Sequence, residues 1–129
     1  MPPTKLMLGF LVVVAVPAFI LWLRNRKRPP ILVTPEASAW GACFYSDARS
    51  RDVAARFILI VSEHSGAKIT QLTPDTTFIE DLNLTDLEPV EILMATEEEF
   101  KIEFSESDAA SLISIGRAID YISGKYRSS

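Results

Sequence analysis

The chain has 129 residues and a mass of 14.3 kDa, enough for one ordinary globular domain. Its formal net charge of −4 is unevenly divided, because residues 1–51 carry +5 and residues 52–129 carry −9. The acidic C-terminal part excludes nucleic acid as an expected partner, since phosphates repel it. One cysteine excludes an intramolecular disulfide, and one histidine leaves no expected metal site and no ordinary Cys/His catalytic pair.

An uncharged, strongly apolar run of 18 residues, 6–23, lies near the start of the chain. As a helix it would reach about 27 Å, close to the ~30 Å hydrocarbon core of a bilayer. Four of the next five residues are Arg or Lys, whereas Lys5 alone precedes the run. The positive-inside rule then predicts a single transmembrane helix within an anchor over residues 1–28. We expect membrane localisation with the lipid bilayer as a partner, and a C-terminal domain that faces the cytoplasm or its topological equivalent. A cleaved signal peptide and an organelle-targeting segment are the alternative interpretations.

Residues 29–49 are predicted to be a linker or docking segment. Pro29 and Pro30 break the preceding helix and begin a stretch that we expect to be irregular to about Asp47. Its aromatic content exceeds that of a plain flexible linker. The segment is therefore expected to lie on a membrane surface or on the domain, or to be a docking peptide for a partner. Cys43 is a candidate for lipidation near the membrane or an ordinary thiol.

A helical pattern begins at Ser50 and opens the predicted domain over 50–129. The apolar residues between 53 and 61 follow i, i+4, i+7 and i+8 spacing, which marks one buried face. Gly66 is expected to end this helix. His64 lies near that end, where the helix dipole favours a cation, so we assign it a structural role. A long loop follows.

The second main helix is expected to begin near Asp86, because Thr85 to Glu88 fits the capping-box pattern. Ser105 should open a short helix, and Ser114 should cap a last helix that stops at Gly124. The sequence therefore predicts an all-α bundle of three main helices and one short helix. Its core should contain Phe57, Phe78, Leu82, Val90, Phe100, Ile119 and Ile122.

Several blocks of the domain resemble the acyl carrier proteins in order and spacing, over roughly residues 52–125. These blocks are residues 78–82, Leu87, residues 90–95, residues 97–104 and residues 118–122. The resemblance implies an acyl-carrier-like bundle and a link to fatty acid biosynthesis. It also implies that a serine in an Asp-Ser-Leu motif, at the start of the second main helix, carries 4′-phosphopantetheine. The thiol of that group holds the acyl chain.

This attachment serine is missing, because the corresponding tripeptide is Thr85-Asp86-Leu87 and Asp86 occupies its position. Phosphopantetheine transfer needs a hydroxyl oxygen that attacks a phosphate, and a carboxylate has no hydroxyl. Thr85 is the nearest hydroxyl, but a shift of one residue turns a helical side chain by about 100°. We therefore expect no cofactor. The alternative is 4′-phosphopantetheine attached at a non-standard residue.

The acidic outer face of the second main helix is retained. The resemblance implies that Glu91 and Glu98 match positions that meet basic patches on partner enzymes. A solvated face that aids solubility is the simpler interpretation. We predict a protein partner with a basic patch, such as a lipid or fatty-acid enzyme or a membrane complex. The predicted partner-binding residues are Asp86, Leu87, Glu88, Glu91 and Glu98.

The predicted function is that of a membrane-anchored, acyl-carrier-like module that lacks a prosthetic group and binds or scaffolds a protein. The alternative is a working carrier that delivers acyl chains to membrane enzymes. An enzyme is not expected and no catalytic residue is assigned, because the carboxylates lack a nucleophile or a base partner.

Overall fold

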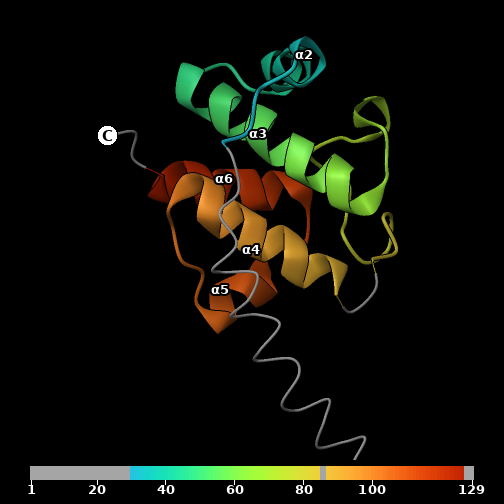
Figure 1. The fold of residues 1–129 in the computed structure, drawn as a ribbon, viewed down its shortest axis with the longest axis vertical. Helices are drawn as coiled ribbons and strands as arrows, with labels where there is room; N and C mark the ends of the chain where they lie inside the picture. Colours follow the sequence, from blue (N-terminus) through green and yellow to red (C-terminus); the bar gives the residue numbers. More distant parts are fainter. Residues whose placement is uncertain (1–29, 85–86, 127–129) are drawn as a thin grey trace, which may run out of the picture.

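The structure is a computed structural model that describes residues 30–84 and 87–126, and over these ranges the chain is helical (Figure 1). No strand is present in this part, which has one isolated antiparallel bridge, between Thr77 and Ser114. The predicted bundle of three main helices and one short helix is confirmed, and within residues 30–84 one further helix precedes it. The elements are α2 (Pro35–Phe44), α3 (Ala48–Ser65), the 3-10 helix η1 (Ile69–Gln71), α4 (Glu88–Phe100), α5 (Glu106–Ser111) and α6 (Ile115–Lys125).

Local capping explains where the predicted helices begin and end. Asp47 accepts a hydrogen bond from the Ser50 amide at 2.9 Å and starts α3 two residues before the predicted position. Gly66 ends α3 in the left-handed conformation, with φ of 77°, as predicted. Ser105 and Ser114 cap α5 and α6, also as predicted, by accepting backbone N–H groups of the first turn. Helix α6 continues to Lys125, one residue beyond the predicted stop.

Helix α2 corrects the expectation that the chain stays irregular to Asp47. Thr34 accepts a hydrogen bond from the Ala37 amide at 3.2 Å, and Pro35 stands in the first turn, where a missing N–H costs nothing. The helix packs against α3, and Figure 1 shows it at the far side of α3 from α4. A β-carbon on Gly41 would lie 2.8 Å from the Arg51 carbonyl oxygen, so this approach requires glycine.

Helix α4 begins two residues later than predicted. Leu87 is its N-cap residue, has helical dihedral angles and makes no side-chain capping bond. Pro89 restricts the backbone of Glu88, which disfavours a helical turn before this point. The predicted capping box depends on Thr85, which lies outside the described residues.

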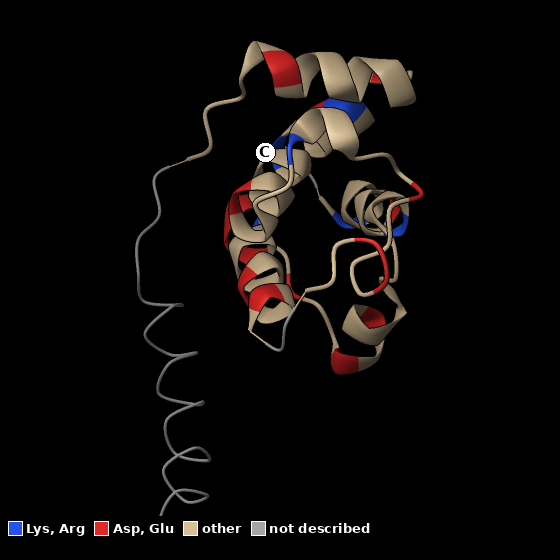
Figure 2. Cartoon of the chain, turned by 90° about the vertical axis from the view of Figure 1, so that its right-hand side faces the viewer, with Lys and Arg blue, Asp and Glu red and all other residues tan. Residues whose placement is uncertain are grey.

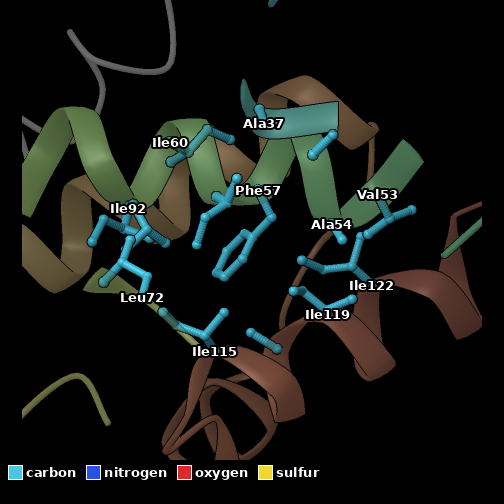
Figure 3. Packing of buried hydrophobic residues seen from close by; sticks show 14 of the residues in the cluster. Ala37, Val53, Ala54, Phe57, Ile60, Leu72, Ile92, Ile115, Ile119 and Ile122 are labelled. Carbon is cyan, nitrogen blue, oxygen red and sulfur yellow. The ribbon is translucent and has the colours of Figure 1, made fainter. Parts of the chain in front are cut away.

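The hydrophobic core joins α3 to α4, α6 and the loop before α4 (Figure 3). Phe57, Phe100, Ile119 and Ile122 are buried as predicted. Phe78 and Leu82 are only partly buried and pack against this core, and Val90 is half-buried. The buried face of α4 includes three residues that the predicted core does not contain, Ile92, Ala95 and Thr96.

Backbone hydrogen bonds tie the long loop to the start of α6. The Phe78 amide donates to the Ile113 carbonyl at 3.2 Å, and the Ile115 amide donates to the Thr76 carbonyl at 3.0 Å. The Gly116 amide donates to the Pro74 carbonyl at 2.8 Å, and a β-carbon on Gly116 would lie 2.9 Å from that oxygen. The loop is therefore held in place although it contains little regular structure.

The predicted membrane localisation is corrected. Among residues 30–84 and 87–126, no helix is both long enough and apolar enough to cross a bilayer. We therefore withdraw the interpretation of the chain as a single-pass membrane protein. The proposed span over residues 6–23 lies outside the described residues. The division of the chain at residues 28 and 49 stays a prediction.

Candidate functional site

The position that corresponds to the attachment serine lies just before α4. Leu84 precedes it and is buried, and Leu87 follows it with 52% of its surface exposed. Thr85 and Asp86 lie outside the described residues. The candidate site is therefore the N-terminal end of α4, where the helix dipole favours negative charge.

Three of the predicted partner-binding residues lie along α4. Glu88 and Glu91 stand in its first turn, and Glu98 stands seven residues beyond Glu91 on the same side of the helix. The rise between Glu88 and Glu98 is about 15 Å, because an α-helix rises about 1.5 Å per residue. Figure 2 shows acidic segments along the length of this helix. The carboxylates therefore form a stripe on α4 rather than a single cluster.

Glu91 also contacts the end of α3. Its Oε2 atom lies 3.4 Å from Nδ1 of His64, whose side chain is only 10% exposed. The pair is ionic only when the imidazole is protonated. His64 therefore joins the last turn of α3 to the first turn of α4, which agrees with the structural role assigned to it.

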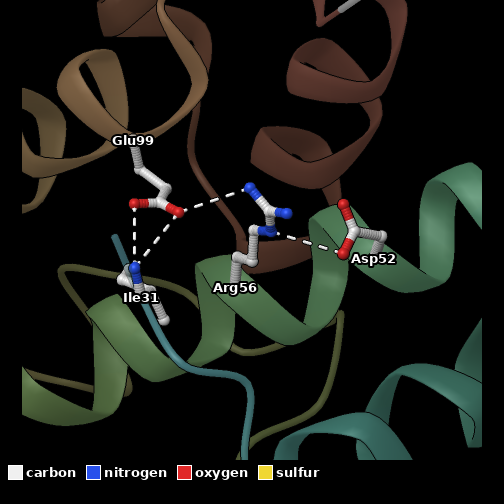
Figure 4. Close-up of polar contacts among 4 residues, drawn as sticks. All are labelled: Ile31, Asp52, Arg56 and Glu99. Carbon is white, nitrogen blue, oxygen red and sulfur yellow. Dashed lines mark hydrogen bonds and ion pairs between the residues drawn. The ribbon is translucent and has the colours of Figure 1, made fainter. Parts of the chain in front are cut away.

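Glu99 makes contacts that the sequence analysis did not foresee (Figure 4). The Ile31 amide lies 3.4 and 3.3 Å from its two carboxylate oxygens and donates to them. Arg56 Nη1 donates to the same carboxylate at 3.3 Å, and Arg56 Nε lies 3.3 Å from Asp52 Oδ1. The Glu99 side chain is 9% exposed. This carboxylate therefore links the segment before α2 to α3 and belongs to the internal packing.

An apolar cavity of about 330 Å³ lies beside the first turns of α4. Pockets for small molecules usually have ~300–1,000 Å³, so this cavity is at the lower end of that range. Among the described residues that line it, none is charged and Thr96 is the only polar one. Thr96 is buried and donates its hydroxyl to the Ile92 carbonyl at 2.7 Å. The lining residues are Phe57, Phe78, Ile79, Pro89, Val90, Ile92, Leu93, Thr96, Phe104, Ala109, Ala110, Leu112, Ile113 and Ala118.

Apolar side chains are exposed at this end of the molecule. Ile79 is 64% exposed and Ile113 is 57% exposed, and both line the cavity. Leu87, the residue before α4, is 52% exposed. Of these three residues, Leu87 alone was predicted to contact a partner, because Ile79 and Ile113 become neighbours at the cavity only through the pairing of the loop with the start of α6.

A second internal contact holds α5 against α6, next to the cavity. The Tyr121 hydroxyl donates to Asp108 Oδ2 at 2.8 Å, and the Ser105 hydroxyl oxygen accepts a hydrogen bond from the Asp108 amide at the start of α5. The hydrogen bond from Tyr121, followed by that from Ser105, holds the pKa of the Asp108 carboxyl below its ordinary value. Lys125 lies 5.1 Å from the centre of the Tyr121 ring. These contacts fix the helix that forms one wall of the cavity.

The residues at the site do not offer standard attachment chemistry for phosphopantetheine. Residue 86 is a carboxylate with no hydroxyl to form a phosphodiester. The cavity alone has the apolar character that an acyl chain would need. Within the described ranges, no group of three or more His, Cys, Asp and Glu side chains could hold a metal ion.

Comparison with known proteins identifies the family. No family model matches the chain. A protein of Schizosaccharomyces pombe that is named "Putative acyl carrier protein, mitochondrial" is 42% identical over 80 residues, which cover 61% of this chain and 70% of the yeast protein. Acyl carrier proteins are carriers and not enzymes, so the prediction that this chain is not an enzyme is confirmed. The matched length, the helical bundle and the blocks around α4 agree with one another, and the chain belongs to the acyl carrier protein family.

Proposed function

We propose that this chain is a member of the family that carries no phosphopantetheine and acts as a protein-binding or scaffold module. The observation that carries the proposal is Asp86, a carboxylate at the position of the attachment serine, next to an acidic helix that is retained. The proposed partner is a protein with a basic patch. The proposed contact residues remain Asp86, Leu87, Glu88, Glu91 and Glu98.

The chemistry of residue 86 supports the loss of the prosthetic group. A serine hydroxyl attacks the phosphate of coenzyme A and forms a stable phosphodiester. Attack by a carboxylate would instead give a mixed anhydride, which water hydrolyses readily. Thr85 has a hydroxyl, but its position differs by about 100° around the helix axis if the helical phase is continued.

The arrangement of charge on α4 supports a basic partner. Glu91 and Glu98 lie on one side of the helix, and residues 78–110 hold eleven acidic residues against one basic residue, Lys101. Such a field attracts a basic surface and accelerates its encounter with the protein. The interaction should weaken with added salt, because exposed charges are screened over about 10 Å at 0.1 M ionic strength.

A working carrier is the second candidate, and the cavity beside α4 favours it. An apolar space of about 330 Å³ beside the first turns of α4 would shelter part of an acyl chain. In this alternative, 4′-phosphopantetheine is attached to a non-standard residue such as Thr85.

The intact mass of the protein separates the two candidates. The wild-type chain and the Asp86→Ser variant are each incubated with coenzyme A and a permissive phosphopantetheinyl transferase. We expect no added mass on the wild type and partial modification of Asp86→Ser, whose surroundings still lack the usual aspartate at position 85. An added phosphopantetheine mass on wild-type protein from its own host would show that it is a carrier, and peptide mapping would locate the attachment.

Charge reversal tests the proposed contact surface. Glu91→Lys/Glu98→Lys should strongly weaken capture of the natural partner from a cell extract, since like charges placed at an interface cost several kcal/mol. The matched control is Glu36→Lys/Glu63→Lys, which reverses two exposed carboxylates on α2 and α3. Equal capture by both double variants would contradict a role for α4, provided that circular dichroism shows both to be folded.

We propose a mitochondrial location for the chain. The yeast relative is named as a mitochondrial protein, and residues 1–28 of this chain hold five basic residues and no acidic residue. An acid-poor, basic N-terminal segment is typical of mitochondrial targeting. Cell fractionation with an antibody against the folded part tests this, and a signal confined to the cytosol would contradict it.

A further inference from the structure

We propose that the cavity beside α4 is a docking pocket for one apolar side chain of a basic partner segment, a leucine or phenylalanine flanked by Lys or Arg. This inference rests on the proposed function, because a covalently held acyl chain would compete for the same space. It adds the chemistry of the contact to the proposed basic partner.

The size and lining of the cavity suit an aliphatic or aromatic side chain. Its walls include Phe57 and Phe78, whose rings meet edge to face at 6.3 Å and 88°. The Thr96 hydroxyl is satisfied by the Ile92 carbonyl, so the lining offers no unpaired side-chain donor to a polar ligand. An occupant therefore gains from burying apolar surface and not from hydrogen bonds to these side chains.

The cavity is accessible at a rim that is itself apolar. Ile79 and Ile113 line the cavity and are each more than half exposed. Their backbones are held in place by the bond from the Phe78 amide to the Ile113 carbonyl. Exposed, contiguous apolar side chains beside a preformed pocket are a common feature of protein interfaces, in which a buried anchor residue is surrounded by weaker contacts.

The charge around the cavity favours particular residues on either side of the apolar side chain that binds in it. The loop, α4 and α5 form most of its wall. They lie within residues 78–110, which hold eleven acidic residues and one basic residue, Lys101; of the acidic residues, Glu99 is paired internally with Arg56 of α3. Figure 2 shows acidic segments on the loop, α4 and α5. A free fatty acid would bring its carboxylate into this negative field without a cation in the lining. A peptide with Lys or Arg beside its apolar residue is instead attracted.

A random-peptide library displayed on phage, selected against the full-length chain, tests the inference. The blocking variant is Ala110→Trp, which places an indole at an exposed residue of the cavity lining. Its matched control is Ala39→Trp, the same change at an exposed alanine of α2, away from the cavity. We expect the selected peptides to share a leucine or phenylalanine flanked by Lys or Arg. Ala110→Trp should weaken their binding by about tenfold or more, and Ala39→Trp should leave it unchanged.

Three results would overturn the inference. They are a failure to select peptides, selection of peptides without an apolar residue between basic ones, and equal loss of binding in both tryptophan variants. Dodecanoate is titrated in parallel. If it binds the wild type but not Ala110→Trp, and no peptide is selected, the pocket belongs to free fatty acids. The intact mass of the same preparation keeps the two proposals apart. An added phosphopantetheine refutes the proposed function, whereas unmodified protein that selects no such peptide refutes the docking pocket alone.

Discussion

Replacing Trp40 by phenylalanine tests whether α2 is an integral part of the fold. Trp40 is 6% exposed, and its indole N–H donates to the Leu72 carbonyl at 2.7 Å, across the 32 residues that separate them in the chain. Phenylalanine keeps a ring in the site but has no donor. The Leu72 carbonyl, in a residue only 2% exposed, would then lose this partner.

The expected loss follows from burial and from the lost bond. An unsatisfied buried acceptor costs about 1–3 kcal/mol, and we expect Trp40→Phe to reduce the free energy of unfolding by this amount. Trp40→Ala should cost more, about 3–5 kcal/mol, because it also leaves a cavity between α2 and the core. Phe44→Leu is the control, since Phe44 is 44% exposed and lies at the end of the same helix.

Urea unfolding followed by circular dichroism measures the global effect, and amide hydrogen exchange measures the local one. If α2 unfolds together with the bundle, the midpoint falls while the slope is unchanged. If α2 detaches first, its amides exchange faster while those of α3 and α6 keep their protection. An unchanged midpoint together with unchanged exchange in α2 for Trp40→Phe would refute the proposed anchoring by the indole.

Three further changes have defined outcomes. Phe100→Ala should lower the free energy of unfolding, measured in urea, by about 3–5 kcal/mol, because Phe100 is 1% exposed. The same change at the exposed Phe44 should cost much less. Equal effects of the two changes would mean that the α4 register is wrong. Gly116→Ala should destabilise by about 1–3 kcal/mol through its clash with the Pro74 carbonyl. Gly124→Ala, in open space near the end of α6, should stabilise by up to about 1 kcal/mol, and thermal melts that rank the two variants in the opposite order would contradict the close approach. Burial, followed by the charge of Asp120, raises the pKa of Tyr45 from 10.0 to about 12. The folded state therefore holds the Tyr45 proton more tightly, so its contribution to stability is complete below pH 10.0 and is lost as the pH rises toward 12. A phenolate absorbance titration of Tyr45 centred at pH 10.0 would disprove the raised pKa.

The helices of the bundle could be predicted because their signals are local. Gly66 adopts a left-handed conformation that few other residues tolerate, and Ser105 and Ser114 offer hydroxyls to the next amides. Helix α2 was missed although it carries the same kind of signal. Thr34 followed by Pro35 is a helix start, but it lies inside the stretch that Pro29 and Pro30 led us to expect as irregular.

The candidate site could be predicted only where it follows the chain. The acidic residues of α4 are visible from their spacing, and Asp86 is visible against the family motif. The cavity is not, because its lining runs from Phe57 to Ala118 and meets only in the folded state. The contact of Glu99 with Ile31 joins residues 68 positions apart, so no local pattern could separate Glu99 from the neighbouring glutamates.

Contacts among described residues fix the walls of the cavity. The loop is bonded to the start of α6 through Phe78 and Ile113, and α5 is fixed by the bond from Tyr121 to Asp108. The base of α4 is joined to α3 through Glu91 and His64. Each contact lies within the described part of the chain and is made by atoms other than those that form a phosphodiester. Under the proposed function, a carboxylate at residue 86 lacks the hydroxyl for attachment, and the apolar cavity and the acidic helix beside it are the features that we propose to bind a partner.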